Sequence, residues 1–264
     1  MQTMRQTFAA VTNDLLATNR QTAVAIADIG ARDFDPSDRV VNLGIREQAL
    51  IGVTAGMALS GLRPIAHSYA PFLIERPFEQ IKIDLTHQDL GAILVSIGAS
   101  FDAAAEGRTH QAPGDVALMA TLPGWTIHVP GHPDEVASVL KESVANNDRV
   151  YIRLAEDQNQ DPNRNGGTLT RIREGSAHSA TAIAVGPMLD RTLAATESLD
   201  MTVLYTSTVR PFDGAGLHRA TSGTDLILIE PYLEGTSAAE VSRTLSDRPH
   251  RLLSIGVPNS EHRR

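Results

Sequence analysis

Short apolar runs alternate with amphipathic stretches along the first 155 residues of the chain. The apolar runs are typical of buried strands and occupy residues 22–29, 40–44, 62–70, 92–98, 125–130 and 150–154. Between them, apolar residues recur at helical spacing, which predicts helices over 46–60, 77–88, 114–122 and 132–147. Strand–helix alternation with short connections predicts a mostly parallel sheet with helices on both faces.

The segment 155–167 interrupts this pattern. It consists of AEDQNQDPNRNGG, in which no apolar residue follows Ala155, and this composition predicts an exposed linker, placed at 157–167. Beyond it, apolar runs predict strands over 181–187, 201–213, 225–231 and 251–258, with helices near 188–199 and 236–246. The sequence therefore predicts two α/β domains, at 1–156 and 168–264, each a mostly parallel sheet flanked by helices.

Composition excludes several classes of function. Of the 264 residues, 42% are hydrophobic and 20% are charged, which is typical of a globular protein. The formal net charge of −8 makes nucleic acid and anionic membranes poor partners. The absence of cysteine excludes disulfides, zinc–thiolate sites, iron–sulfur clusters and a cysteine nucleophile.

Neither a membrane span nor a metal site is predicted. No apolar run approaches the roughly 18–20 residues that cross a bilayer. The N-terminal residues Met4, Phe8 and Val11 recur at helical spacing and indicate a first helix rather than a signal peptide, so a cytoplasmic location is expected. His128 and His132 are four residues apart, but Pro130 between them prevents the helix that would align them on one face.

One segment places an acidic residue where a helix begins. Residues 43–61 read LGIREQALIGVTAGMALSG, and Gly44 allows a sharp turn before Glu47 opens the helix. A carboxylate in the first turn lies near the positive end of the helix dipole. From spacing alone, Glu47 is either a site residue or an ordinary first-turn glutamate that stabilises the helix.

Two later segments favour the functional interpretation. They are SYAPFLIERPFEQIKIDL at 68–85 and AEGRTHQAPGDVALMATLPGWTIHVPGHPDEV at 105–136. In order and spacing, these segments and 43–61 resemble the thiamine-diphosphate-dependent transketolases and the related deoxyxylulose-phosphate synthases. The resemblance covers essentially the whole chain, because VLYTSTVRPFD and DLILIEPYLEGTSAAEVSRTL are similar to the family's C-terminal domain.

The resemblance assigns four residues to the cofactor, thiamine diphosphate. Glu47 matches the catalytic glutamate that shares a proton with N1′ of the aminopyrimidine ring and thereby activates the cofactor. Phe72 matches the aromatic residue that stacks on this ring, and Phe78 would supply a second apolar wall. Asp28 matches an acidic residue on the thiazolium side. Without the resemblance, Phe72 is equally well an ordinary core residue.

Further residues are assigned to the substrate. His110 matches a histidine that faces the substrate, where it is expected to hydrogen-bond or to transfer protons at the donor's hydroxyl groups. Arg153 matches an arginine that holds a sugar phosphate, with a salt bridge at the strand end as the alternative. Arg5 matches a second phosphate-binding arginine.

Three residues depart from the family pattern near the substrate. Glu106 and Arg108 belong to E-G-R-T-H, where many transketolases have D-G-P-T-H, and Arg32 stands where a small serine is common. Arginine binds phosphate and other anions well. These arginines are expected either to change substrate recognition or to pair with the acidic surface.

The half of the site that binds the diphosphate and Mg²⁺ has no counterpart in this sequence. Complete transketolases carry it in a preceding domain with a G-D-G signature, which this chain lacks. The resemblance therefore implies the smaller subunit of a split transketolase, active only with a larger thiamine-diphosphate-binding subunit, most simply with two copies of each chain. This complex would transfer a two-carbon ketol unit from a ketose donor to an aldehyde-type or specialised acceptor.

Other interpretations stay open. Half of a deoxyxylulose-phosphate synthase, or a β-type subunit of a 2-oxo acid dehydrogenase, would use the same glutamate and cofactor with a 2-oxo acid as donor. A non-catalytic binding or scaffold subunit would keep only the fold. The string T-H-Q at 109–111 argues against the dehydrogenase, and the joint presence of Glu47, Phe72 and His110 argues against the scaffold.

Overall fold

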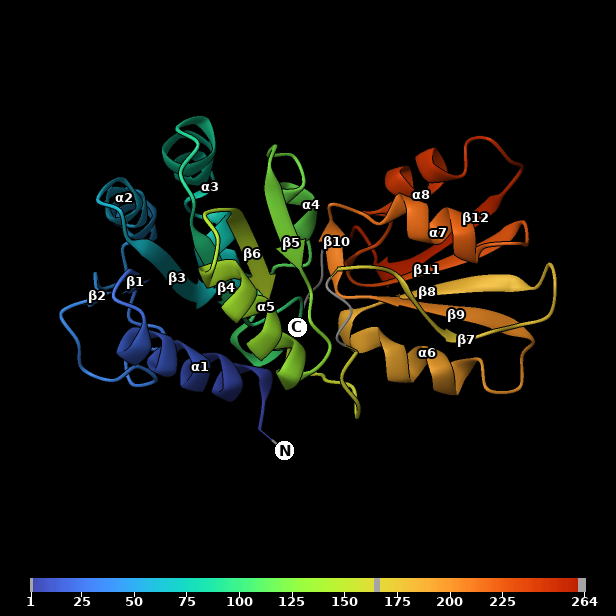
Figure 1. The fold of residues 1–264 in the computed structure, drawn as a ribbon, viewed down its shortest axis with the longest axis horizontal. Coiled ribbons are helices and arrows are strands. Elements are labelled where there is room, and N and C mark those ends of the chain that lie inside the picture. The colour runs from blue at the N-terminus through green and yellow to red at the C-terminus, as the bar shows by residue number, and fades with distance from the viewer. Residues whose placement is uncertain (1, 164–166, 261–264) are drawn as a thin grey trace.

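The computed structural model describes residues 2–163 and 167–260, which hold two β-sheets side by side (Figure 1). The first sheet has the strand order β10-β5-β6-β4-β3-β1-β2. Its strands are β1 (Thr22–Ile26), β2 (Val40–Asn42), β3 (Arg63–Tyr69), β4 (Ile93–Ile97), β5 (Trp125–His128), β6 (Arg149–Arg153) and β10 (Thr208–Arg210). The described pairs are parallel except that between β10 and β5, so the carboxyl ends of β1 to β6 lie at one edge.

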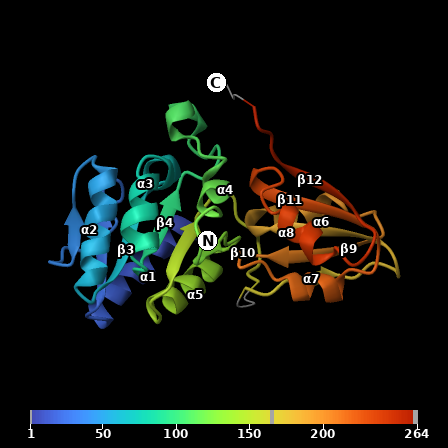
Figure 2. The ribbon, with the colours of Figure 1, turned by 90° about the horizontal axis from the view of Figure 1, so that it is seen from above.

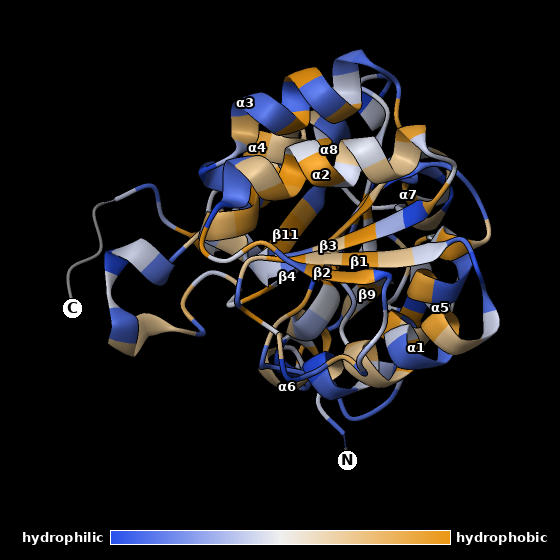
Figure 3. Ribbon diagram, turned by 90° about the vertical axis from the view of Figure 1, so that its left-hand side faces the viewer, coloured by the Kyte–Doolittle hydropathy of each residue, from blue (hydrophilic) through white to orange (hydrophobic). Residues whose placement is uncertain are grey.

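Helices cover both faces of the first sheet (Figure 3). On one face lie α1 (Met4–Thr18) and α5 (Pro133–Val144). On the other face lie α2 (Glu47–Leu59), α3 (Phe78–Gln80) and α4 (Asp115–Met119), with the π-helical turns η1 (Pro71–Glu75) and η2 (Ile81–His87) next to α3 in the chain. Two short 3₁₀ turns, η3 (Ala104–Glu106) and η4 (Arg108–His110), follow β4.

The fully buried strand β1 shows how the sequence forms these layers. Val24 and Ile26 belong to the core cluster that includes α1 and α5, whereas Ala25 and Ala27 belong to the cluster that includes α2. Successive side chains of a strand point to opposite faces of the sheet. The small alanines therefore leave room for α2 against the sheet, while the branched residues fill the space beneath α1.

The second sheet has the order β12-β11-β8-β9-β7 and lies beside the first (Figure 2). Its strands are β7 (Thr170–Arg173), β8 (Ala180–Val185), β9 (Met201–Thr206), β11 (Asp225–Leu233) and β12 (Arg251–Val257). Only β7 runs antiparallel among the described pairs. The 3₁₀ turn η5 (Gly186–Met188) and helices α6 (Leu189–Ala195), α7 (Gly214–Ala220) and α8 (Ala238–Thr244) complete this part.

The predicted fold class is confirmed: two mostly parallel sheets are flanked by helices. The segment expected as an exposed linker differs, because Asn159 is fully buried. Its backbone N–H donates to the carbonyl of Gly131 at 2.7 Å, and its Nδ2 donates to the carbonyl of Gly186 at 3.0 Å. The expectation of an exposed tether is therefore wrong at Asn159, since this residue satisfies backbone groups in both halves of the chain. Residues 164–166 of the expected linker lie outside the described residues.

Candidate functional site

Glu47 lies where the chain leaves the sheet edge and enters α2. Gly44 adopts a left-handed conformation with φ of +66°, which glycine accepts without a side-chain clash, and the helix begins three residues later at Glu47. The carboxylate is buried, with a side-chain exposure of 5%. At this first helical position it lies beside backbone N–H groups that have no partner within the helix, and they favour negative charge.

Arg76 is the partner of this buried carboxylate. Its Nη1 donates to Oε1 of Glu47 at 2.8 Å. Its guanidinium carbon also lies 3.8 Å from the centre of the Phe72 ring, at a distance typical of a cation–π contact. Phe72 lies in the π-helical turn η1, a rare geometry that often occurs at functional sites, and Arg76 directly follows that turn. The planar guanidinium therefore bridges Glu47 and Phe72.

Two further rings extend this arrangement. The ring of His110 lies 4.8 Å from that of Phe72 and 5.8 Å from that of Tyr69, both edge-to-face. Tyr69 ends β3, whereas His110 ends η4, and Nδ1 of His110 forms a hydrogen bond of 2.9 Å with Oγ1 of Thr109. The structure thus brings Glu47, Phe72 and His110 to one region, together with Arg76 and Tyr69.

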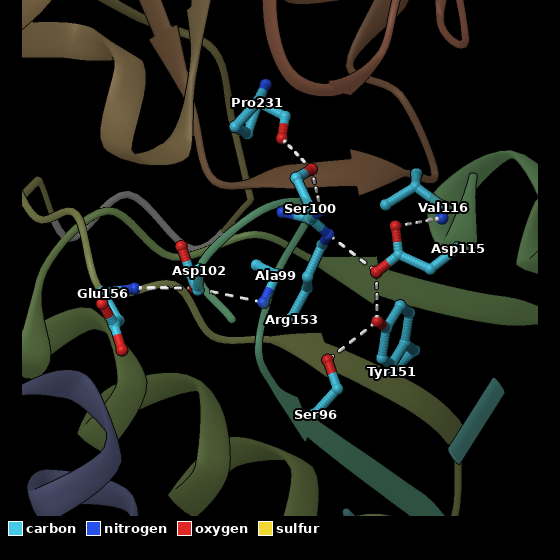
Figure 4. Close-up of polar contacts among 10 residues, drawn as sticks. All are labelled: Ser96, Ala99, Ser100, Asp102, Asp115, Val116, Tyr151, Arg153, Glu156 and Pro231. Carbon is cyan, nitrogen blue, oxygen red and sulfur yellow. Dashed lines mark hydrogen bonds and ion pairs between the residues drawn. The ribbon is translucent and has the colours of Figure 1, made fainter. Parts of the chain in front are cut away.

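Arg153 lies in a buried hydrogen-bond and ion-pair network (Figure 4). Its side chain and that of Asp115 both have 0% exposure, and Nε of Arg153 donates to Oδ2 of Asp115 at 2.7 Å. Nη2 of Arg153 donates to Oγ of Ser100, and the hydroxyl of Tyr151 donates to the same Asp115 oxygen. Two of the three guanidinium nitrogens are therefore held by side chains of the protein itself, and Nη1 has no hydrogen-bond partner among the described residues. The structure therefore favours the salt bridge, the alternative interpretation of Arg153.

The rings of Tyr69, Phe72 and His110 form an aromatic cluster. A cavity of about 520 Å³ adjoins this cluster and is lined in part by Tyr69, Arg5, Asp102 and Glu106. Two of the predicted substrate residues, Arg5 and Glu106, thus share one cavity. Burial raises the pKa of Asp102 to about 6, although backbone N–H groups of Glu156 and Ala99 that donate to its carboxylate act in the opposite direction (Figure 4).

Three further predicted residues lie near the surface. Arg5, predicted to bind phosphate, forms an ion pair with Asp33 of the same chain at 2.9 Å. Asp28 is exposed after β1 and accepts a hydrogen bond from Asn42. Arg32 is also exposed.

Phe78 packs on the core, whereas Arg108 lies at the surface beside the His110 segment. Phe78 is half-buried and packs against the core cluster that includes α2. Arg108 is exposed, and its Nη1 donates to the backbone carbonyl of Gln111, one residue beyond His110. Within residues 2–163 and 167–260, no group of three or more His, Asp or Glu side chains is placed to hold a metal ion, and no helix combines the length and apolar character that crossing a membrane requires.

The sequence motifs did not indicate Arg76 or Asp115. Both lie inside the segments that carry the family resemblance, Arg76 four residues after Phe72 and Asp115 five residues after His110. The i, i+4 spacing on a helical turn was an available signal for Arg76. Nothing local indicated that Asp115 pairs with Arg153, because the two residues are 38 positions apart.

Comparison with known proteins shows which family the chain resembles. The family of the transketolase pyrimidine-binding domain matches residues 3–160. An uncharacterized 33.6 kDa protein in the fasciation locus of Rhodococcoides fascians is 46% identical over 260 residues, which cover 95% of this chain and 82% of that protein. An apulose-4-phosphate transketolase subunit of Actinobacillus succinogenes is 31% identical over 193 residues, covering 69% of this chain and 61% of that protein.

A solved structure has a similar fold over nearly the whole chain. It is described as a split gene transketolase in an inactive β4 tetramer. The two folds agree with a TM-score of 0.83 at 25% sequence identity, over 97% of this chain and 89% of that one.

The chain therefore belongs to the transketolase family, with a pyrimidine-binding domain that occupies more than half of its length. Within that family it is the smaller subunit of the split type, in which the C-terminal part of a transketolase forms a separate chain. Membership of the family implies dependence on thiamine diphosphate.

Proposed function

We propose that this chain supplies the aminopyrimidine side of a thiamine diphosphate site in a two-chain transketolase. The complex transfers a two-carbon ketol unit from a ketose donor to an aldehyde-type acceptor. The observation that carries the proposal is the meeting of Glu47, Phe72 and His110, from three separate segments, at one edge of the sheet.

The residues present fit the aminopyrimidine ring. Between the buried carboxylate of Glu47 and the face of Phe72 there is room for a planar nitrogen group, because the guanidinium of Arg76 already lies there. Glu47 would hold a proton at N1′ of the ring, and Phe72 would support one face of it. When bound, the cofactor supplies the nucleophilic carbon that carries the ketol unit.

His110 and the adjoining cavity form the substrate side of the proposal. The imidazole lies against Phe72 and is positioned to hydrogen-bond to a hydroxyl group of the donor. Arg5 and Glu106 line the cavity next to Tyr69, which in turn contacts the His110 ring. We assign this cavity to the polar chain of the sugar, with Arg5 nearest to an anionic end. The remaining predicted contacts are exposed: Asp28, Arg32 and Arg108.

A larger partner subunit would bind the diphosphate and Mg²⁺, most simply in a complex with two copies of each chain. A net charge of −8 is unfavourable for holding a diphosphate without cationic help. The related split transketolase chain is described as inactive when it forms a β4 tetramer. Both observations support a requirement for the partner.

Calorimetry tests the proposal directly. Thiamine diphosphate with Mg²⁺ is titrated into this chain alone and into its mixture with a candidate larger subunit. Tight binding only in the mixture, followed by turnover of a ketose donor rather than a 2-oxo acid, is the expected result. Tight binding by the chain alone would exclude a shared site.

The role of Glu47 is tested in the same mixture with Glu47→Gln, which removes the titrating group but keeps the size of the side chain. Turnover is expected to fall by at least about 100-fold, because loss of a positioned acid–base group usually has an effect of 10²–10⁴. Glu174→Gln is the matched control, since Glu174 also pairs with an arginine but has a side-chain exposure of 72% in the second domain. Unchanged turnover in Glu47→Gln would remove Glu47 from the mechanism.

A further inference from the structure

Both contacts that the proposed function gives to the aminopyrimidine ring are made by Arg76 in the structure. Its Nη1 donates to the carboxylate of Glu47 at 2.8 Å. The same guanidinium lies 3.8 Å from the ring centre of Phe72. A ring that stacks on this face of Phe72 and hydrogen-bonds to Glu47 cannot bind while the guanidinium stays there.

We propose that Arg76 is an internal substitute for the aminopyrimidine ring, and that cofactor binding displaces its side chain from Glu47 and Phe72. This inference rests on the proposed function and adds a regulatory step to it. The free subunit keeps its cofactor pocket filled by its own arginine, and the pocket opens only when a ligand replaces both contacts.

The surroundings of Arg76 allow the side chain to leave without a change of fold. Its backbone N–H donates to the carbonyl of Pro71 at 3.1 Å, and its own carbonyl accepts from Nε2 of Gln48 at 3.3 Å. These bonds fix the backbone of Arg76 to η1 and to the first turn of α2. The side chain, in contrast, has an exposure of 40%, so rotation about its own bonds takes the guanidinium into solvent.

The chemistry of arginine explains why it suits this position. Glu47 is buried, and a buried carboxylate without a partner is unfavourable. A guanidinium is planar and donates hydrogen bonds in its own plane, so it stacks on an aromatic face while it pairs with a carboxylate. An aminopyrimidine ring shares both properties. Arg76 therefore stabilises the cofactor-free subunit through the same two contacts that the cofactor needs.

This arrangement lowers the apparent affinity for the cofactor. A ligand that binds only the open state has an apparent Kd raised by the inverse of the fraction of molecules in that state. Removal of the guanidinium should therefore tighten binding. A direct contact between Arg76 and the cofactor would have the opposite sign, because its removal would weaken binding.

The test is calorimetric titration of thiamine diphosphate with Mg²⁺ into the two-chain mixture, with Arg76→Met in this chain. We expect the Kd to fall about fivefold, the effect of removing a competing cation–π and ion-pair contact. Arg76→Lys keeps the charge but loses the planar stack, and an intermediate Kd is expected. Arg171→Met is the matched control, because Arg171 has a similar exposure of 41% and also pairs with a glutamate at 2.8 Å, but lies in the second domain.

A second measurement covers the case in which Arg76→Met folds poorly. Glu47→Gln removes the charge that Arg76→Met leaves unpaired, so the double variant should regain most of the melting temperature lost by Arg76→Met in the full chain. Without such recovery, the pair does not stabilise the free subunit. An unchanged or higher Kd in Arg76→Met overturns the inference alone, because the wild-type mixture still binds. Absence of binding by the wild-type mixture overturns the proposed function and the inference together.

Discussion

At the scale of single residues, the two buried ion pairs differ in how far they are open to solvent. Glu47 is buried, but its partner Arg76 is 40% exposed. Arg153 and Asp115 are both fully enclosed. A pair with one exposed partner can exchange that partner for a ligand, whereas an enclosed pair can exchange neither without leaving a buried charge. We therefore assign the first pair to the proposed site and expect the second to stabilise the framework around it.

This distinction predicts that Arg153→Met mainly destabilises the protein. The variant leaves Asp115 buried without its cation, and a loss of about 3–5 kcal/mol in the free energy of unfolding is expected. Urea denaturation of the full chain measures it. Asp115→Asn in the same chain should recover part of the loss by removing the unpaired charge. A loss below about 0.5 kcal/mol with a raised KM for a phosphorylated donor would restore Arg153 to the substrate site.

At the scale of elements, hydrophobic periodicity predicted strands β1 to β6 of the first sheet well. It failed where the helical period changes. Residues 77–88 are predicted as one helix, but the structure divides them into α3 and the π-helical turn η2. Segments as short as α3 and η2 contain too few helical turns for the spacing of apolar residues to distinguish an α-helix from a π-helix. The apolar run 201–213 likewise divides into β9 and β10, which join different sheets, and periodicity carries no information about the partner strand.

The candidate site was predictable only in part, because a local sequence pattern does not indicate which distant residues come into contact. The family resemblance indicated Glu47, Phe72 and His110, each of which lies within a short motif. It did not indicate what those residues contact. Arg76 is 29 positions from Glu47, and their pairing depends on how Arg76, directly after η1, lies against the first turn of α2. The resemblance also did not indicate that Arg153 pairs with Asp115, because this carboxylate comes from another element.

Two glycines of one segment test how the turn before α2 positions Glu47. Gly44→Ala forces a left-handed backbone on a residue with a Cβ atom and should lower the free energy of unfolding by about 1–2 kcal/mol. It should also weaken cofactor binding by the two-chain mixture, since it disturbs the start of α2. Gly56→Ala is the control. Gly56 lies within α2 with open space around it, so alanine should raise the free energy of unfolding by about 0.5–1 kcal/mol. Equal effects of both substitutions on urea denaturation would contradict a special role of the turn.

At the scale of the whole molecule, the second domain holds the segment that carries His110. Oγ of Ser100 donates to the carbonyl of Pro231, and the N–H of Leu233 donates to the carbonyl of Pro113, both at 2.7 Å. These contacts fix the two ends of residues 100–113, which a β-bridge between Ser100 and Ala112 also closes. Through them the second domain supports the position of His110, although none of its described residues contributes a ring to the cluster of Tyr69, Phe72 and His110.

The same docking predicts that the two domains unfold together and that Asn159 couples them. Asn159→Ala leaves the carbonyl of Gly186 without this donor and the N–H of Asp190 without this acceptor. A loss of about 2 kcal/mol is expected for buried groups left unsatisfied. Asp161→Ala, an exposed change in the same segment, should stay within about 0.5 kcal/mol.

Calorimetric melting of the full chain measures this coupling. In wild type we expect one transition, because β10 of the second half of the chain completes the first sheet and the buried amide of Asn159 joins both domains. In Asn159→Ala the transition should move to lower temperature and broaden, as the domains begin to melt separately. Two resolved transitions in wild type, or equal melting of both variants, would mean that the segment acts as the independent tether its composition indicates, and that the position of His110 does not depend on how the domains dock.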